Sequence, residues 1–427
     1  MIQATTRMVN AIWKSEEIPH QWRRSDIKPI YKGKGTKEDL ANYRGVFLSN
    51  TICKIFEKMV YRKLEPIIDE KMTEFQAGAR KGRRTTDHIL TLKTKVEYDQ
   101  YIKRDTYVQF YDIVKCFDKL WLRDVMYDLG NNGVTGKMYR LIFLLNNRTR
   151  ITVKTPYGNT EEYEIGELVR QGSVLGAVIS ANSLETVIKD AEYGHTETTM
   201  GDLLLYPLCF LDDIAAVSNS LLQARKNQTV IEVYQDRKRL QLHPEKSQYL
   251  IKEKHNKDEE EIIINDQKMK RTGEYRYLGE YITDKRVETT TVDKRIKEAN
   301  GIMNEILAVV SLPEIENRRI EIGIKLAGAC LDSKLLYNSE TWIRIKNSDI
   351  KKLESAQYNF YKRLIRVPTG TPNIAITMEL GILPMEYKIQ KRKLMEYQRL
   401  MKMKQVRLTK KATMEAMEMG SRNLVDE

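Results

Sequence analysis

The sequence predicts an α+β fold with an antiparallel sheet at its centre and a helical C-terminal third. Two apolar runs flank a pair of adjacent aspartates within Leu203–Val217, a pattern typical of a strand–turn–strand hairpin. Tyr107–Tyr111 is rich in β-forming residues and runs directly into another acid. Beyond Ile282 the sequence becomes helical. These observations predict a mixed fold in which acids lie at strand ends.

Length and charge limit the classes of protein that fit. A chain of 427 residues with 41% hydrophobic content predicts two or three packed units. The formal net charge of +13 favours a polyanionic partner, with nucleic acid ahead of an anionic membrane, although abundant lysine also serves solubility. No apolar run approaches the roughly 18 residues of a membrane span, so none is expected.

Cysteine usage indicates an intracellular protein. The four cysteines are scattered and form no Cys-x-x-Cys spacing. They are Cys53, Cys116, Cys209 and Cys330. We therefore expect reduced core thiols and neither a disulfide framework nor a zinc site.

The first hairpin is predicted near the N-terminus, after a helical segment that ends by Ile18. A strand over Ile27–Tyr31 enters a basic loop with two glycines, and Asn42–Leu48 returns as the second strand. Such a hairpin would aim Lys32, Lys34 and Arg44 at one place. Cations on a glycine loop suit a triphosphate, and the alternative is a solvated basic turn.

A cluster of cations follows the next predicted helix, Thr51–Ile68, whose apolar residues recur at helical spacing. The cluster surrounds two glycines just before a helix that begins at Thr85 or Thr86. Its members are Arg80, Lys81, Arg83 and Arg84. Cations beside the free amides of a helix N-terminus predict a phosphate site, with a nucleic-acid backbone as the ligand.

Residues 120–282 are predicted to alternate between helices and strands. These elements are helical segments within Leu120–Leu145 that are interrupted between Gly130 and Gly136, strands at Ile151–Val153 and Glu162–Ile165, a helix at Leu221–Leu240, and strands at Tyr249–Ile251 and Tyr275–Ile282. The charge run Lys252–Glu261 is predicted to be a solvated hairpin tip.

The acidic pair Asp212–Asp213 allows two interpretations. Aspartate is common in exposed turns. Unpaired carboxylates are costly to bury, however, so a partly buried pair at a hairpin tip is normally neutralised by a cation.

The C-terminal third is predicted to be a set of packed helices. Ala299–Leu312 and Ile315–Leu336 carry apolar residues at helical spacing. Ser348 is predicted to cap a helix that runs to Arg366 and leaves basic residues outside its apolar seam. Those residues are Lys351, Lys352, Lys362, Arg363 and Arg366.

The order of the motifs resembles that of reverse transcriptases, most closely those of non-LTR retrotransposons of the LINE type, over about residues 20–370. The segments that carry the resemblance are Pro29–Gly35 with Asn42–Gly45, Gln76–Arg83, Phe110–Asp118, Arg170–Gly176, Phe210–Asp213, Leu242–Lys246, Tyr277–Gly279 and Leu336–Trp342. Each segment alone is a weak signal, and their common order is a strong one.

The resemblance implies a right-hand polymerase with fingers, an antiparallel-sheet palm and an all-helical thumb. The implied division is an N-terminal helical extension at 1–25, fingers at 26–105, palm at 106–283 with a helical segment at 119–150, thumb at 284–382, and a helix-prone extension or tail at 383–427. No endonuclease or Cys/His knuckle pattern is found, so we expect a polymerase core or a fragment of a longer polyprotein.

The implied activity is RNA-directed DNA polymerisation by two-metal phosphoryl transfer. In such sites two cations lie about 3.5–4 Å apart and hold the attacking and leaving oxygens. The resemblance implies that Asp112 and Asp212 bridge the metals, that Asp213 supports them, and that the Ile113 carbonyl is a further ligand. Mg²⁺ prefers oxygen ligands, with Mn²⁺ as the alternative cation.

The implied nucleotide site uses residues from three motifs. The matching positions are Lys32, Arg44, Phe117, Gln171 and Gly172. Phe117 matches a steric gate against the ribose 2′-hydroxyl, although it also fits a core position. Lys246 matches a general acid for the leaving pyrophosphate. The implied partners are an RNA template, a DNA primer, their RNA–DNA hybrid and a dNTP, in a nuclear and cytoplasmic ribonucleoprotein.

Several positions depart from the family pattern. Leu211 stands where the family has a small residue, and the other departures are Ala79, Arg84, Cys116 and Ala177. None removes an implied metal ligand. They leave two alternatives open: a catalytically impaired or domesticated RNA-binding protein, and a protein like an intron maturase. The sequence carries no signal for oligomeric state.

Overall fold

The computed structural model describes residues 2–33, 35–167, 169–170, 172–252, 261–264, 267–285 and 288–423. The chain forms two compact units. The first unit comprises the described parts of 1–85, 107–249 and 256–270, and the second those of 86–106, 250–255 and 271–427. Lys34, Gln171 and most of the predicted hairpin tip at 252–261 lie outside the described residues. The implied fingers, palm and thumb boundaries remain predictions.

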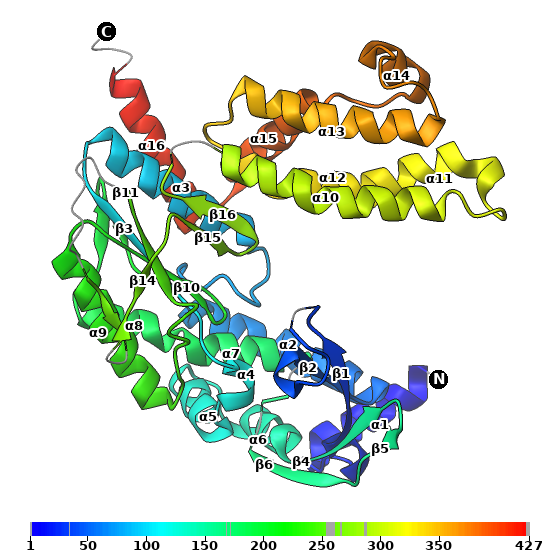
Figure 1. The fold of residues 1–427 in the computed structure, drawn as a ribbon. Coiled ribbons are helices and arrows are strands. Elements are labelled where there is room, and N and C mark those ends of the chain that lie inside the picture. The colour runs from blue at the N-terminus through cyan, green and yellow to red at the C-terminus, as the bar shows by residue number, and fades with distance from the viewer. Residues whose placement is uncertain are drawn as a thin grey trace. The chain divides into compact units, whose positions relative to one another are not determined.

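The first unit combines helices with short strands (Figure 1). Its helices are α1 (Ile2–Ser15), η1 (His20–Arg23), η2 (Leu40–Asn42), α2 (Thr51–Lys71), α4 (Cys116–Lys119), α5 (Leu122–Asn131), α6 (Gly136–Asn146), α7 (Gly176–Leu184), α8 (Thr186–Tyr193) and α9 (Leu221–Lys238). Its strands are β1 (Arg24–Tyr31), β2 (Tyr43–Leu48), β4 (Asn147–Thr155), β5 (Gly158–Asn159), β6 (Tyr163–Glu167), β7 (Thr198–Met200), β8 (Leu203–Leu205), β9 (Leu208–Phe210), β10 (Asp213–Ser218), β12 (Ile263–Ile264) and β13 (Gln267–Lys268). Strands β3 (Thr106–Tyr111), β11 (Gln248–Lys252) and β14 (Lys270–Arg271) have residues in both ranges.

The predicted N-terminal hairpin is confirmed. β1 pairs with β2 in antiparallel register, with Ile30 opposite Arg44, and pairs with β4 in parallel on its other side. The Lys32 amide donates to the Asn42 carbonyl at 2.8 Å and closes the loop. The Tyr31 hydroxyl donates to the Gly35 carbonyl at 2.6 Å, so the loop is held by its own side chains and backbone.

The predicted acidic hairpin is also confirmed. β10 is antiparallel to β9, with Asp213 opposite Phe210, so Leu211 and Asp212 form a two-residue turn. β10 is antiparallel to β3 on its other side, with Ile214 opposite Tyr111. All residues of β3 are buried, as expected for a central strand. This register places the end of β3 beside the acidic turn.

A buried ion pair joins the loop before α7 to α2. The Arg170 Nη2 atom lies 2.6 Å from Glu57 Oε1, and both side chains are fully buried. Arg170 Nη1 donates to the Trp22 carbonyl at 3.1 Å, and the Val174 amide donates to Glu57 Oε2 at 2.8 Å. The pair therefore fixes the path of the loop that carries Gly172.

The second unit is mainly helical. Its helices are α3 (Thr85–Tyr101), α10 (Thr289–Val309), η3 (Glu316–Arg318), α11 (Arg319–Leu326), the π-helical η4 (Ala327–Leu331), α12 (Asp332–Leu335), η5 (Ser339–Thr341), α13 (Asn347–Ile365), α14 (Asn373–Leu380), α15 (Met385–Lys402) and α16 (Leu408–Asn423). Its hairpin is β15 (Glu274–Tyr277) and β16 (Glu280–Thr283). Figure 1 shows α10, α11 and α12 beside α13, and these helices share one apolar core that includes Trp342 and Phe360.

Two helix predictions in this unit need correction. The helix expected over Ile315–Leu336 is broken into segments around a π-helical turn, a feature that periodicity does not reveal. Ser348 does not cap α13, because the helix already begins at Asn347. Lys346 occupies the N-cap position and makes no side-chain capping hydrogen bond.

A buried carboxylate anchors the β15–β16 hairpin within the second unit. Glu280 is fully buried, and its oxygens lie 2.9 Å from Lys93 Nζ and 3.3 Å from Arg295 Nη2. Trp342 Nε1 donates to Glu280 at 3.0 Å, and the Tyr337 hydroxyl donates to the Leu278 carbonyl at 3.0 Å. The Leu336–Trp342 segment singled out from the sequence thus serves as a structural anchor.

The thiols largely follow the prediction. Cys53, Cys116 and Cys209 are free and buried, whereas Cys330 is exposed and is not a core thiol. Cys330 lies in the π-helical turn, where Ala327 and Leu331 are the buried residues. Within the described part of the chain, no helix is long and apolar enough to cross a membrane.

Removal of one member of the Arg170–Glu57 pair should destabilise the first unit. Arg170→Met leaves the Glu57 carboxylate buried without its cation, and we expect a loss of about 3–5 kcal/mol in the free energy of unfolding. Arg24→Met, which breaks the exposed pair with Glu162, should cost less than about 1 kcal/mol. Urea unfolding followed by circular dichroism measures both. Equal effects of the two substitutions would contradict a structural role for the buried pair.

Candidate active site

The chain turn after β3 positions Asp112. The Asp112 amide donates to Ser247 Oγ at 3.2 Å, and its carbonyl accepts from the His243 amide at 2.8 Å. Its carboxylate lies 3.3 Å from Lys246 Nζ. The Leu242–Lys246 turn therefore holds Asp112 through backbone bonds and supplies a cation at its carboxylate.

Three carboxylates repel one another at the hairpin tip. Burial raises the pKa of Asp213 to about 6, with further contributions from the negative charges of Asp212 and Asp112. Burial also raises the pKa of Asp212, the charge of Asp112 adds to this rise, and the Arg44 guanidinium opposes it. Although Asp213 keeps an open side to solvent, the surrounding protein still removes part of its hydration. The predicted acids are thus close enough to interact, and Arg44 is close enough to Asp212 to act on its charge.

The donor set suits a hard divalent cation. Carboxylate oxygens are the side-chain ligands that Mg²⁺ prefers. The isolated bridge between Ile113 and Leu242 uses the Asp112 carbonyl and the Val114 amide, so it does not engage the Ile113 carbonyl. In the part of the chain that the structure describes, no group of three or more His, Cys, Asp or Glu side chains is arranged as a ready metal site. The ligand set therefore remains a prediction.

The predicted nucleotide residues are only partly brought together. Arg44 lies near Asp212, as its effect on that carboxylate shows. Gly172 has a φ of +93° and lies against the β2 backbone, with its ideal Cβ position 3.5 Å from the Phe47 carbonyl. Lys32 is exposed at the base of the hairpin loop, and Phe117 is half-buried in α4. Gln171 lies outside the described residues.

Comparison with known families identifies the chain. The family model of the reverse transcriptase (RNA-dependent DNA polymerase) matches residues 34–282, which include all three acids. The chain belongs to the reverse transcriptase family. The predicted α+β right-hand polymerase class and the nucleotidyltransferase class are thereby confirmed, and the acids occupy the matched region.

Two curated relatives come from Drosophila melanogaster transposons. The probable RNA-directed DNA polymerase from transposon BS is 26% identical over 184 residues, which cover 40% of this chain and 19% of the relative. The corresponding protein from transposon X-element is 26% identical over 183 residues, covering 41% and 19%. These matches bear out the resemblance to non-LTR retrotransposon enzymes, and the matched part of this reverse transcriptase corresponds to about a fifth of each relative.

Solved telomerase structures are distant neighbours of this reverse transcriptase. Apo telomerase from Candida tropicalis, truncated from the C-terminal domain, has a TM-score of 0.46 and 13% identity, covering 65% of this chain and 57% of that chain. Telomerase from Candida albicans with a telomeric RNA fragment has a TM-score of 0.43 and 9% identity, covering 90% and 65%.

The cation cluster before α3 divides into buried and exposed members. Arg80 was predicted to bind phosphate, but its guanidinium is buried, donates to Asp69 Oδ1 at 2.6 Å and to the Gln76 carbonyl at 2.9 Å, and so has a structural role. Arg83 also pairs internally, at 2.5 Å from Glu74 Oε1. Lys81 and Arg84 are exposed. Of the four cations, these two have exposed side chains, and their contact with a backbone phosphate remains a prediction.

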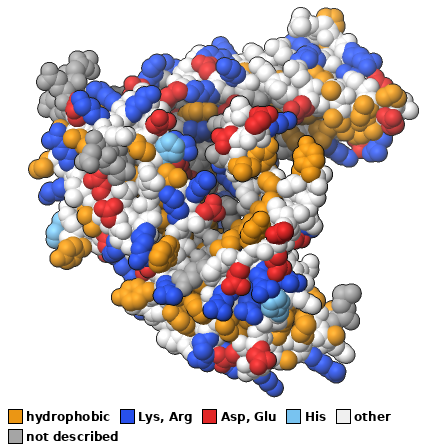
Figure 2. All heavy atoms as spheres, turned by 60° about the horizontal axis from the view of Figure 1, so that its bottom comes forward, with side chains coloured by type: hydrophobic (Ala, Val, Ile, Leu, Met, Phe, Trp, Pro, Cys, Tyr) orange, Lys and Arg blue, Asp and Glu red, His pale blue; other side chains and the backbone are white. Residues whose placement is uncertain are grey.

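The basic residues of α13 also divide into exposed and buried members. A groove of about 810 Å³ between α10 and α13 is lined by Lys351, Lys352 and Arg363, together with polar Asn300 and Asn359. Lys362 was predicted to contact nucleic acid, but it is buried and donates to the Thr369 carbonyl at 2.8 Å. Figure 2 shows basic and acidic side chains interspersed over the visible face, so charge alone does not mark a binding site.

The exposed cations of this groove differ in their partners. Lys352 lies 2.7 Å from Asp293, and Arg366, outside the groove, lies 2.5 Å from Glu316. Arg363 donates to Asn304 at 3.0 Å. These pairs are exposed, where an ion pair is weak and can be exchanged for a phosphate.

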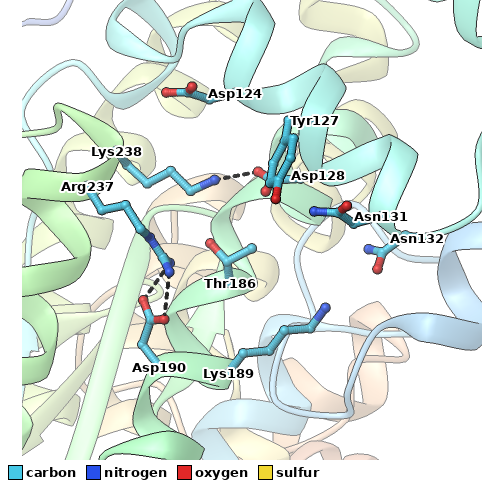
Figure 3. A pocket seen from close by; sticks show the side chains of 10 residues that line it. All are labelled: Asp124, Tyr127, Asp128, Asn131, Asn132, Thr186, Lys189, Asp190, Arg237 and Lys238. Carbon is cyan, nitrogen blue, oxygen red and sulfur yellow. Dashed lines mark hydrogen bonds and ion pairs between the residues drawn. The ribbon is translucent and has the colours of Figure 1, made fainter.

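A second polar pocket of about 330 Å³ lies among α5, α8 and α9 (Figure 3). Lys238 lies 2.5 Å from Asp128, and Arg237 donates to both oxygens of Asp190 at 2.9 and 2.6 Å. Most of the charges of this pocket are thus satisfied by one another. We assign these ion pairs to holding the three helices together.

Sequence reasoning missed three residues that support the site. Glu57 lies on the buried face of α2 with Cys53 and Val60, so a charge at an apolar position was its signal. Ser247 follows the Leu242–Lys246 segment, and its hydroxyl accepts from the Asp112 amide. Gln76 was named only as the first residue of the Gln76–Arg83 segment that carries the resemblance, whereas its side chain contacts the acidic turn.

The pKa of Asp213 should depend on Asp112. In metal-free protein, carboxyl-detected NMR should show Asp213 titrating near pH 6, and Asp112→Asn should lower this pKa by removing a repelling charge. Because the folded-state pKa lies above the ordinary value of 3.8, ionisation of Asp213 should reduce folding stability as pH rises from 3.8 to about 6. Asp118→Asn, in the same motif, should leave the titration unchanged. A normal Asp213 pKa in the wild type would contradict the clustering of these acids.

Proposed function

We propose that this chain is an RNA-directed DNA polymerase that extends a DNA primer on an RNA template. The observation that carries the proposal is that Asp112, at the end of β3, lies close enough to Asp212 and Asp213 at the adjoining hairpin tip for its charge to act on both, within the matched family region. Burial, with the neighbouring negative charges adding to it, raises the pKa values of Asp212 and Asp213, and a bound divalent cation would favour their ionised forms.

Asp112 and Asp212 would hold two Mg²⁺ ions, with Asp213 and the Ile113 carbonyl in support. When bound, such ions stabilise the attacking and leaving oxygens of an in-line phosphoryl transfer. The protein's part is to hold the three carboxylates close together in a fixed register, while the bound cations would favour their ionised forms. Ser247 and the His243 amide orient Asp112, and the β9–β10 turn presents the other two acids.

The cations at the site would bind the triphosphate of a dNTP. The positive charge of Arg44 opposes the rise in the pKa of Asp212, and Lys32 lies with Arg44 on the β1–β2 hairpin. Lys246, which is mostly exposed, would release Asp112 to the metal and serve as the proton donor to the pyrophosphate. Phe117 would restrict the 2′-position of the ribose of the incoming nucleotide. Gly172 and Gln171 would contact the base pair that this nucleotide forms with the template.

The α10–α13 groove would bind the RNA–DNA hybrid. Its lysine and arginine side chains alternate with asparagine and serine along one helix face, which suits contacts to phosphate and sugar without sequence readout. Lys81 and Arg84 would provide further backbone contacts. The implied fingers, palm and thumb would follow the boundaries stated above.

A primer-extension assay tests the activity. With an RNA template, a DNA primer, dNTPs and Mg²⁺, the wild type should extend the primer, and Asp212→Asn should reduce the rate at least about 100-fold, because transition-state charge is no longer stabilised. Asp118→Asn serves as the matched control and should stay within about threefold of the wild type.

Parallel reactions with ribonucleotides and with a DNA template define the substrate. Retained hybrid binding with no extension by the wild type would overturn the proposal and support a domesticated RNA-binding protein. Strong preference for one structured RNA, without extension, would instead support a maturase-like role.

The hybrid groove makes a separate electrostatic prediction. Lys351→Gln and Arg363→Gln should each weaken binding of an RNA–DNA hybrid and lower the slope of log K against log salt by about 0.7–0.9 per contacted phosphate. Lys325→Gln removes an exposed cation elsewhere in the same unit and should leave the slope unchanged. Fluorescence anisotropy across a salt series gives the slopes. Identical slopes for all four proteins would exclude the groove as the binding surface.

A further inference from the structure

The segment Phe75–Ala77 runs beside β9 as an extra backbone partner. The Cys209 amide donates to the Phe75 carbonyl at 2.8 Å, and the Ala77 amide donates to the Cys209 carbonyl at 2.9 Å. Gln76 and Cys209 form an isolated parallel bridge. The segment that leads into the cation cluster is therefore hydrogen-bonded to the strand that precedes the acidic turn.

The Gln76 side chain reaches the turn itself. Its Oε1 atom accepts from the Gly78 amide at 2.8 Å and from the Leu211 amide at 3.0 Å. The Gln76 side chain is fully buried, so its acceptor oxygen is shielded from water. Both bonds are directed to one oxygen, which fixes the distance between the two chain segments.

Leu211 has a backbone conformation that needs such support. Its φ is +57°, in the left-handed region that a branched side chain adopts only at a cost of about 1–3 kcal/mol. Hairpin turns of this kind favour glycine at the first central position. Leu211 immediately precedes Asp212, so relaxation of its backbone would redirect the carboxylate.

Close packing and buried bonds keep Gln76 in place. A Cβ atom on Gly78 would overlap the backbone nitrogen and side chain of Leu211, so glycine is required for this approach. Arg80 Nη1 donates to the Gln76 carbonyl at 2.9 Å while its Nε bonds Asp69 at 2.6 Å. A chain of hydrogen bonds thus runs from Asp69 in α2 through Arg80 and Gln76 to the Leu211–Asp212 turn.

We infer that Gln76 is a positioning residue that holds the strained Leu211–Asp212 turn in its catalytic conformation. The inference rests on the proposed polymerase function for its catalytic consequence, but the turn geometry does not depend on it. Gln76 acts through Leu211 and contacts no substrate.

Hydrogen exchange tests the positioning role without requiring activity. Gln76→Leu keeps the side-chain volume and removes the acceptor, so the Leu211 amide should exchange at least about tenfold faster, which corresponds to about 1.4 kcal/mol of lost protection. Gln109→Leu is the matched control, because Gln109 is also fully buried in this unit but bonds the Ala224 carbonyl instead. Unchanged exchange at Leu211 in Gln76→Leu would overturn the inference.

Primer extension then tests the catalytic consequence through a double-mutant cycle. Gln76→Leu should lower kcat about 10- to 100-fold while the hybrid Kd stays within about twofold. Leu211→Gly removes the strain, so the same substitution in that background should cost at least about threefold less. Equal losses in the two backgrounds would contradict the inference. No extension by the wild type would reject the proposed function, while the exchange measurement would still decide the role of Gln76.

Discussion

Repulsion among the carboxylates of Asp112, Asp212 and Asp213 is the constraint around which the first unit is organised. Three like charges gather at the end of β3 and the adjoining hairpin tip only if other interactions hold them there. The paired register of β3, β10 and β9 supplies the main restraint, because it is set by buried backbone bonds and apolar side chains. The backbone hydrogen bonds and apolar packing of this sheet therefore offset the unfavourable free energy of bringing the three carboxylates together.

Individual hydrogen bonds and nearby cations add to the restraint that the sheet provides. Ser247 and the His243 amide fix the backbone of Asp112, and Gln76 accepts from the amide beside Asp212. Arg44 acts on the charge of Asp212, and Lys246 lies beside the Asp112 carboxylate. These interactions come from different stretches of sequence. The site therefore depends on the fold of the whole unit and not on any single motif.

The sequence predicted the elements better than the uses of their charged residues. Apolar periodicity located both hairpins and most helices, because burial imposes a repeat that can be read along the chain. It could not reveal that Arg80 and Lys362 turn inward, since their partners are backbone carbonyls and, for Arg80, the Asp69 carboxylate, which only the fold of the intervening loops brings within reach. The π-helical turn at Ala327–Leu331 was missed because a single wider turn within a helix leaves no clear mark in the apolar periodicity of the sequence. The acids were singled out because unpaired carboxylates are costly to bury between apolar runs and because the order of the motifs resembles that of reverse transcriptases.

A structure with a primer–template hybrid, a dNTP and Mn²⁺ is the most direct test of the central claim. Anomalous scattering should show two ions about 3.5–4 Å apart, each in contact with carboxylate oxygens of Asp112 and Asp212. Ions bound elsewhere, or an Asp112 carboxylate turned away from the hairpin while nucleotide and hybrid are in place, would contradict the account.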